Sequence, residues 1–126
     1  MEENTGLLEL LLAGRLEEPP EKLLKMSRLS KELGRPVNFK IRALSYNQIN
    51  EFVRGKEDSE LLIVLEGLAE PDLRDKRLLA KFGALTPLEL LRDKRFLRPG
   101  EVISLSRQIE QLSGYREDVF EDAIKN

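Results

Sequence analysis

The stretch "LRDKRLLAKFGALTPLELLRDKRFLRPGE", Leu73 to Glu101, contains the clearest helix boundaries in the chain. Thr86, Pro87 and Glu89 combine an N-cap residue, a proline at the first helical position and an acid at the third, which is the pattern of a capping box. Gly83 is placed to end the helix before it, and Pro99-Gly100-Glu101 is placed to begin the helix after it. The stretch therefore predicts three successive helices, at about 73–82, 87–96 and 100–113.

The tetrapeptide Arg-Asp-Lys-Arg occurs twice in this stretch, at Arg74–Arg77 and at Arg92–Arg95. Asp72 to Arg98 carries eight basic and four acidic side chains, a net charge of +4 in a chain of −2. One interpretation is a small helical nucleic-acid-binding regulator that uses residues 72–98 and inserts the helix after Thr86 into a major groove. An Asp stands in each copy, however, and the segment lacks Asn and Gln, the usual readers of adenine. A solvated or protein-facing surface is therefore favoured, with the two copies at opposite ends of successive helices.

The first 21 residues are acidic and rich in leucine. They contain six acids and one Arg. Leucines recur at helical spacing between Thr5, an N-cap candidate, and Gly14, a stop signal, and the paired prolines of "EEPPE" cannot continue a helix. We expect a mobile acidic N-terminal helix and proline linker over residues 1–21, followed by a single globular domain over 22–126.

The sequence predicts one β-strand and the elements on either side of it. Val37, Phe39 and Ile41 alternate with polar residues, which is typical of a half-buried strand. A hairpin needs a partner, and the only local candidate is Lys25–Leu29, although that segment also fits a helical stripe. Further helices are expected at about 45–54, where Ser45 and Gln48 form a capping-box pattern, at 60–69 and at 117–124. The predicted fold class is mainly α with a small β-hairpin at about 25–42 (α+β), a compact multi-helix single domain.

Composition limits the chemistry. The chain has neither Cys nor His, so it lacks thiolate metal ligands and the commonest neutral-pH acid or base. Its paired carboxylates are interpreted as solvated surface, because tuned acid–base pairs need burial. We therefore expect no enzyme activity, and we assign no catalytic, cofactor-binding or metal-binding residue. Without an apolar run of about 18 residues we expect no membrane span and a cytoplasmic protein.

The order of landmarks resembles that of a known family. The landmarks begin with "ELGRPVNFKIRALSYNQINEF" and continue with Pro71-Asp72-Leu73, Phe82-Gly83, Leu90-Leu91, Pro99-Gly100-Glu101 and Leu112-Ser113-Gly114-Tyr115. In this order they are similar to the XkdN-like phage tail assembly chaperones of prophages and contractile-tailed phages. The resemblance implies strand-turn-strand at the hairpin, and so favours Lys25–Leu29 as the first strand.

The resemblance also implies a function. Tail assembly chaperones coat the tape-measure protein during virion morphogenesis in the bacterial host cytoplasm, and are shed as tail-tube subunits polymerise, so the chain is not expected in the mature virion. The implied partners are the tape-measure protein and, as a second candidate, the tail-tube protein, with a homo-oligomer left open. The expected partner-binding residues are apolar residues near both ends and two arginines, namely Leu8, Leu11, Leu12, Arg92, Arg95, Tyr115, Val119 and Phe120. The alternative, that the apolar residues dock on the core, stays open.

Overall fold

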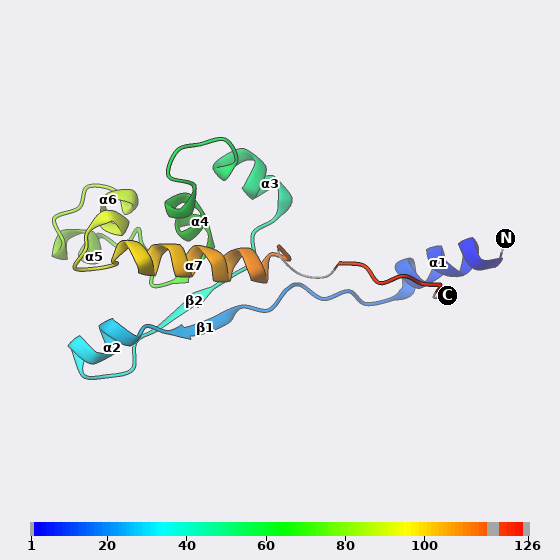
Figure 1. The fold of residues 1–126 in the computed structure, drawn as a ribbon, viewed down its shortest axis with the longest axis horizontal. Helices are drawn as coiled ribbons and strands as arrows, with labels where there is room; N and C mark the ends of the chain where they lie inside the picture. Colours follow the sequence, from blue (N-terminus) through cyan, green and yellow to red (C-terminus); the bar gives the residue numbers. More distant parts are fainter. Residues whose placement is uncertain (1, 116–118, 125–126) are drawn as a thin grey trace.

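The computed structural model describes residues 2–115 and 119–124 and confirms the α+β class (Figure 1). A three-stranded antiparallel sheet consists of β1 (Lys22–Lys25), β2 (Asn38–Ile41) and β3 (Leu68–Glu70), in the order β1-β2-β3. Helix α7 (Pro99–Leu112) runs through the domain. In Figure 1, α3 and α4 lie above α7, while β1, β2 and α2 lie below it.

The alternating strand is confirmed. Phe39 and Ile41 of β2 are buried, and their polar neighbours are not. Phe39 is opposite Leu24 of β1, and Ile41 is opposite Leu68 of β3, with an irregularity in register beside Lys40. Because the centre strand has a partner on each side, the sheet is larger than the predicted hairpin.

The first strand of that hairpin was predicted in the wrong place. The strand is Lys22–Lys25, and residues Ser27–Leu33 form helix α2 instead of continuing an extended segment. Gly34 ends α2 in the left-handed conformation (φ 71°), which glycine adopts without steric cost. The helical alternative that the sequence left open is therefore correct from Ser27 onward, with Met26 at the N-cap and Leu29 in the helix both buried, whereas Leu33 is exposed. The connection between β1 and β2 contains a helix rather than a tight turn.

The remaining helices fall inside or overlap their predicted ranges. They are α1 (Glu2–Ala13), α3 (Tyr46–Gln48) with the π-helix η1 (Ile49–Val53), α4 (Ser59–Gly67), α5 (Lys76–Lys81) and α6 (Pro87–Arg92). The capping boxes at Ser45 and Thr86 are both formed. Each hydroxyl accepts a hydrogen bond from the backbone N–H of the residue three positions later, Gln48 or Glu89, and the side chain of that residue accepts one from the backbone N–H of Ser45 or Thr86. Thr5 lies within α1, which already begins at Glu2, and residues 68–69 belong to β3 rather than to the helix predicted over 60–69.

The helix predicted at 117–124 is not formed over residues 119–124, and residues 117–118 lie outside the described part of the chain. Val119, Phe120 and Ile124 are exposed, Phe120 to 89%. A short helix is marginal in water unless its apolar face packs on something. No such packing surface meets these three side chains, so spacing alone was insufficient to form the helix.

The core is built where α4 crosses α7. Ile109 of α7 is fully buried against Gly67, the last residue of α4, and the two helices make the most extensive helix contact in the described chain. Val64 of α4 and Leu105 of α7 are buried at this crossing. The sheet, α6 and the segment before α7 add further large buried side chains around it, namely Ile41, Leu90, Leu91 and Leu97. A side chain at position 67 would hold the two helices apart.

Replacing Gly67 by Ala tests this close approach. The new Cβ would lie 2.6 Å from Cγ2 and 2.7 Å from Cδ1 of Ile109, a side chain that has no free space to move into. We expect Gly67→Ala to lower the free energy of unfolding by about 1–3 kcal/mol through overpacking. Urea unfolding followed by far-ultraviolet circular dichroism measures the change.

Gly100→Ala is the matched control, because a Cβ on Gly100 meets nothing within 4 Å and the residue lies in the first turn of α7. It should leave stability unchanged or raise it by up to about 1 kcal/mol. Equal stability for the two variants would contradict the proposed packing.

Candidate partner-binding surfaces

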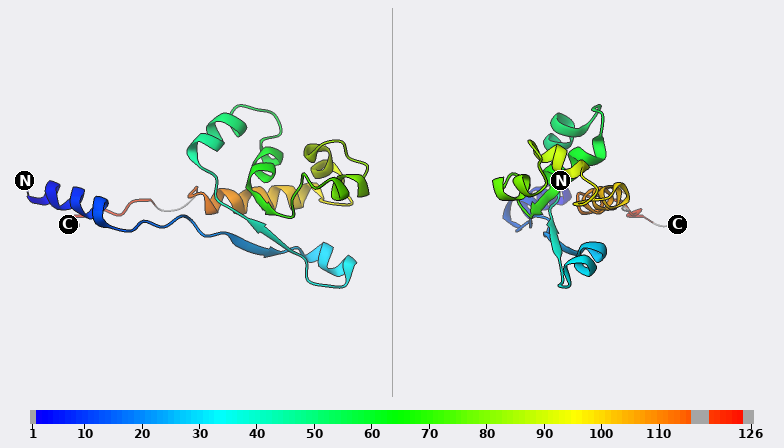
Figure 2. Two further views of the ribbon diagram at one scale, coloured as in Figure 1. Left: turned by 180° about the vertical axis from the view of Figure 1, so that it is seen from behind. Right: turned by 90° about the vertical axis from the view of Figure 1, so that its left-hand side faces the viewer.

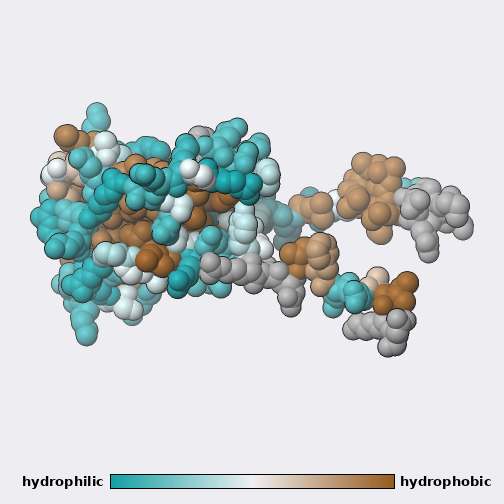
Figure 3. Space-filling model, turned by 45° about the horizontal axis from the view of Figure 1, so that its top comes forward, coloured by the Kyte–Doolittle hydropathy of each residue, from teal (hydrophilic) through white to brown (hydrophobic). Residues whose placement is uncertain are grey.

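Helix α1 carries an uncovered leucine face. With about 100° between successive residues, Leu7, Leu8, Leu11 and Leu12 lie within an arc of about 140°, and Glu9 lies on the opposite side. All four leucines are more than half exposed, Leu12 to 75%. Figure 3 shows hydrophobic surface gathered on segments that project from the body of the molecule. The structure therefore brings the predicted residues Leu8, Leu11 and Leu12 together on one exposed face.

Sequence reasoning missed other members of this surface. Leu7, Leu10 and Leu16 are also exposed, Leu10 to 72%. The same helical spacing that selected Leu8 and Leu11 could have found Leu7. Leu10 extends the face to the other side of Leu7, and Leu16 follows the helix in the linker. The exposed leucine surface is thus wider than the three residues that were predicted.

The predicted C-terminal residues are exposed but separate from α1. Tyr115 follows α7, and Val119 and Phe120 lie in a segment without helix. Both chain ends leave the body on the same side in Figure 1, yet the end-on view of Figure 2 shows the C-terminal segment apart from the N-terminal helix. The structure therefore does not bring Val119 and Phe120 onto the leucine face of α1.

The two predicted arginines already have partners inside the chain. Arg92 pairs with Asp58, which begins the turn into α4. Arg95 pairs with Asp93 at 2.7 Å, donates to the carbonyl oxygen of Phe82 and lies over the Phe82 ring at 5.2 Å. A cation that is engaged in this way has less charge to offer a phosphate backbone.

The repeated tetrapeptide forms the same local contact twice. In the first copy the Asp75 carboxylate accepts bonds from the backbone and guanidinium of Arg77, and in the second copy Asp93 does the same with Arg95. These hydrogen bonds lower the pKa of each carboxyl to about 2. Asp75 is the N-cap of α5 and Asp93 follows the last residue of α6, so the copies stand at opposite helix ends as predicted. The repeat is a local Asp–Arg pairing, used twice.

A further site went unrecognised in the sequence. Arg28 of α2 forms a two-bond contact with Glu101 of α7, from Nη2 to Oε1 at 2.9 Å and from Nε to Oε2 at 3.0 Å. The same guanidinium donates to the Phe96 carbonyl at 3.0 Å and to the carboxylate of Glu32. Both side chains of the pair are largely covered, with 14% and 21% exposed. The residues are 73 positions apart, so no spacing pattern connects them.

Electrostatics at this pair follow from its partial burial. Burial raises the pKa of Glu101, but the hydrogen bond from Arg28, the backbone N–H of Arg98 and the charges of both arginines outweigh it, and the net effect lowers the pKa. The Arg28 pKa is raised chiefly by its bond to Glu101. Both groups are thus held in their charged forms at neutral pH.

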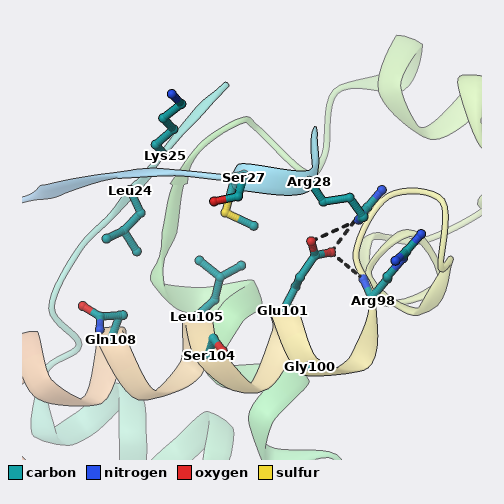
Figure 4. Close-up of a pocket in the computed structure, with 11 residues that line it drawn as sticks. Leu24, Lys25, Ser27, Arg28, Arg98, Gly100, Glu101, Ser104, Leu105 and Gln108 are labelled. Atoms are coloured by element: carbon teal, nitrogen blue, oxygen red, sulfur yellow. Dashed lines mark hydrogen bonds and ion pairs between the residues drawn. The ribbon is translucent and has the colours of Figure 1, made fainter. Parts of the chain in front are cut away.

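Beside this pair lies a groove of about 640 Å³ between β1 and α7. Figure 4 shows Leu24 and Leu105 pointing toward each other across the gap, with Gln108 at one end and Arg28, Glu101 and Arg98 at the other. Ser104 is exposed on the α7 wall. Lys22 stands at the Gln108 end, where its Nζ donates to that side chain at 3.0 Å. The groove combines an apolar middle with basic groups at both ends.

Two other kinds of site were searched for in the same part of the chain. Over residues 2–115 and 119–124, no three acidic side chains come together in a way that could hold a metal ion. None of the helices described is both long enough and apolar enough to cross a membrane.

An α+β domain that carries an uncovered leucine-rich helix has the form expected of a protein that acts by binding other proteins. The family model for the phage XkdN-like tail assembly chaperone protein matches residues 7–126. The chain therefore belongs to the XkdN-like family of phage tail assembly chaperones, as its landmarks had indicated.

A solved structure has a similar fold. The crystal structure of the protein yqbn superposes with a TM-score of 0.65 and 19% sequence identity, over 84% of this chain and 94% of that chain. At this level of identity the likeness concerns the fold alone. No curated protein matches the chain.

Removing the cation of the Arg28–Glu101 pair should destabilise the domain. Arg28→Gln removes the guanidinium that donates to Glu101 and to the Phe96 carbonyl, and we expect a loss of about 2 kcal/mol in the free energy of unfolding. Arg74→Gln removes an exposed cation whose side chain makes no hydrogen bond or ion pair with any described residue, and should change stability by less than about 0.5 kcal/mol. Urea denaturation at pH 7 compares the two variants.

The difference in unfolding free energy between the Arg28→Gln variant and the native chain should also depend on pH. Because the pKa of Glu101 is lowered below 4.5 in the folded state, its contribution is complete above that pH and is lost as the pH falls through the folded-state value. The gap in unfolding free energy should thus shrink as the pH falls below 4.5. A gap that stays constant between neutral and acidic pH would contradict a role for the ionised pair.

Proposed function

We propose that the chain is a prophage-encoded tail assembly chaperone that binds the tape-measure protein during tail morphogenesis in the host cytoplasm. It acts without catalysis and is shed before the virion matures. The observation that carries the proposal is the uncovered leucine face of α1 in a member of the tail assembly chaperone family. An amphipathic helix of this kind binds a partner by placing its apolar side against the partner's apolar side.

The charge of the N-terminal segment fits this role. Residues 1–21 contain six acids against a single Arg, so the free chaperone carries repulsive charge beside its exposed leucines. Charge of one sign disfavours contact between identical helices and keeps an exposed apolar surface from aggregating. We propose that residues 1–21 act as a mobile arm on the domain formed by residues 22–126, and that the arm covers apolar stretches of the tape-measure protein.

The exposed C-terminal residues are proposed as a second contact. Tyr115, Val119 and Phe120 are exposed, and the C-terminal segment lies apart from the N-terminal helix in the end-on view of Figure 2, so both ends of the chain can engage one partner at once or two partners separately. The tail-tube protein is the second candidate partner. Its binding to the C-terminal segment would place the two proteins on different parts of the chaperone.

Co-expression tests the main proposal. The chain, expressed with the tape-measure protein of the same prophage, should raise the soluble yield of that protein and co-purify with it. The triple variant Leu8→Ser, Leu11→Ser, Leu12→Ser should reduce the co-purifying amount about tenfold or more, since three apolar side chains no longer contribute to the contact. Its unfolding midpoint should be unchanged, because these side chains lie outside the core.

Leu85→Ser is the matched control, because Leu85 is also an exposed leucine, 86% exposed, but lies in the loop before α6. It should co-purify like the native chain. A tape-measure protein that remains insoluble with every version of the chaperone would overturn the proposal.

The nucleic-acid alternative makes an opposite prediction. Arg77, Arg92 and Arg95 of the basic segment are each paired with an aspartate of the chain. We therefore expect no binding to duplex DNA even at about 50 mM salt, measured by fluorescence anisotropy. Binding at low salt that falls steeply as salt is added would favour the regulator instead.

A further inference from the structure

The groove between β1 and α7 and the leucine face of α1 have complementary chemistry. Charged groups of the groove lining are Lys25, Arg28, Arg98 and Glu101, and Lys22 stands at its open end. The only acid among them, Glu101, is bonded to Arg28 and to the backbone of Arg98. The groove thus presents apolar side chains with the basic groups of Lys22 and Arg98 at its two ends, whereas α1 presents leucines on an acidic segment.

We propose that α1 of one copy docks its leucine face into the β1–α7 groove of a second copy. Leu8, Leu11 and Leu12 lie over Leu24 and Leu105, and the acids of the arm lie near Lys22 and Arg98 of the second copy. This inference goes beyond the proposed function, since it holds for the chain alone, without a tape-measure protein.

A second copy fits better than the helix of the same chain. Residues 14–21 connect α1 to β1 without regular structure, and a single residue, Glu21, separates Pro19-Pro20 from the strand. Two successive prolines favour a stiff extended backbone. The linker leads α1 away from the body, and α1 lies far from α7's groove-forming half in Figure 1. The arm of one molecule is therefore presented outward, toward a neighbour.

Charge also distinguishes the groove from another α1. Two copies of residues 1–21 are both strongly acidic and repel each other, while the groove ends are basic. Electrostatic attraction thus favours docking of α1 into the groove, whereas electrostatic repulsion opposes pairing of two α1 helices. A contact of this kind weakens as salt rises, because salt screens exposed charges.

Disulfide trapping tests the proposal directly, because the native chain has no cysteine. Leu8→Cys and Ser104→Cys are prepared as separate proteins, one of them with a mass tag, mixed under mild oxidation and analysed by intact mass. The expected product is the mixed disulfide between the two proteins. Asn47→Cys, at an exposed position of α3 outside the groove, replaces Ser104→Cys as the control for random collision.

The other products would overturn the proposal. A dominant Leu8→Cys homodimer would indicate pairing of two α1 helices, and a mixed disulfide no more abundant than with Asn47→Cys would indicate no specific contact. A chain that carries both Leu8→Cys and Ser104→Cys should form intermolecular disulfides. If it instead closes on itself as a monomer, the arm occupies its own groove and the second copy is excluded.

Sedimentation gives an independent test without added cysteines. Ser104→Glu places bulk and negative charge in the groove at an exposed position, and should raise the dissociation constant of self-association about tenfold or more. Asn47→Glu adds the same charge outside the groove and should leave the constant unchanged. Self-association of the native chain should weaken between about 0.05 and 0.5 M salt. A native chain that is monomeric at low salt, or an equal effect of both variants, would contradict the proposal.

Discussion

The contact between Arg28 and Glu101 joins α2 to the first turn of α7, two parts of the chain that are 73 positions apart in the sequence. Arg28 lies in α2, the helix inserted between β1 and β2, and Glu101 lies in the first turn of α7. The same guanidinium donates to the carbonyl of Phe96, just before α7. The start of α7 is therefore fixed relative to the sheet. That position sets how α7 crosses α4 at Gly67, and it leaves the groove between β1 and α7 as an open feature of the surface.

Local signals in the sequence predicted helix ends well and long-range partners poorly. The capping boxes at Ser45 and Thr86 depend on residues three positions apart, and both are formed. The alternation of apolar and polar residues in β2 likewise predicted which side chains are buried. The first strand was misplaced because Met26 to Leu33 fits either structure locally, and packing of Met26 and Leu29 on the core decides for α2. β3 was missed because its three residues adjoin α4 and gain strand structure only by pairing with β2.

The candidate surfaces were predictable to a similar degree. Leucine spacing in α1 identified Leu8, Leu11 and Leu12. Spacing alone cannot distinguish a helix face that is exposed to solvent from one that packs on the core, and in the structure these leucines are exposed. Arg92 and Arg95 were chosen for their charge, yet both are paired with aspartates, Arg95 with Asp93 of the same tetrapeptide and Arg92 with Asp58, which lies 34 positions away in the sequence. The groove could not be predicted at all, since its walls come from residues about 80 positions apart along the chain. The chain belongs to the XkdN-like family, and the leucines of its acidic N-terminal segment are exposed in the structure.

Hydrogen–deuterium exchange of the arm tests this account most directly. Amides of Glu2–Ala13 are measured in the dilute native chain and in its complex with the tape-measure protein. The account predicts rapid exchange in the dilute chain, because the leucines of α1 from Leu7 to Leu12 are exposed, and slow exchange in the complex, because the leucine face is then buried. Slow exchange of α1 in the dilute chain, or exchange that is the same with and without the partner, would contradict it.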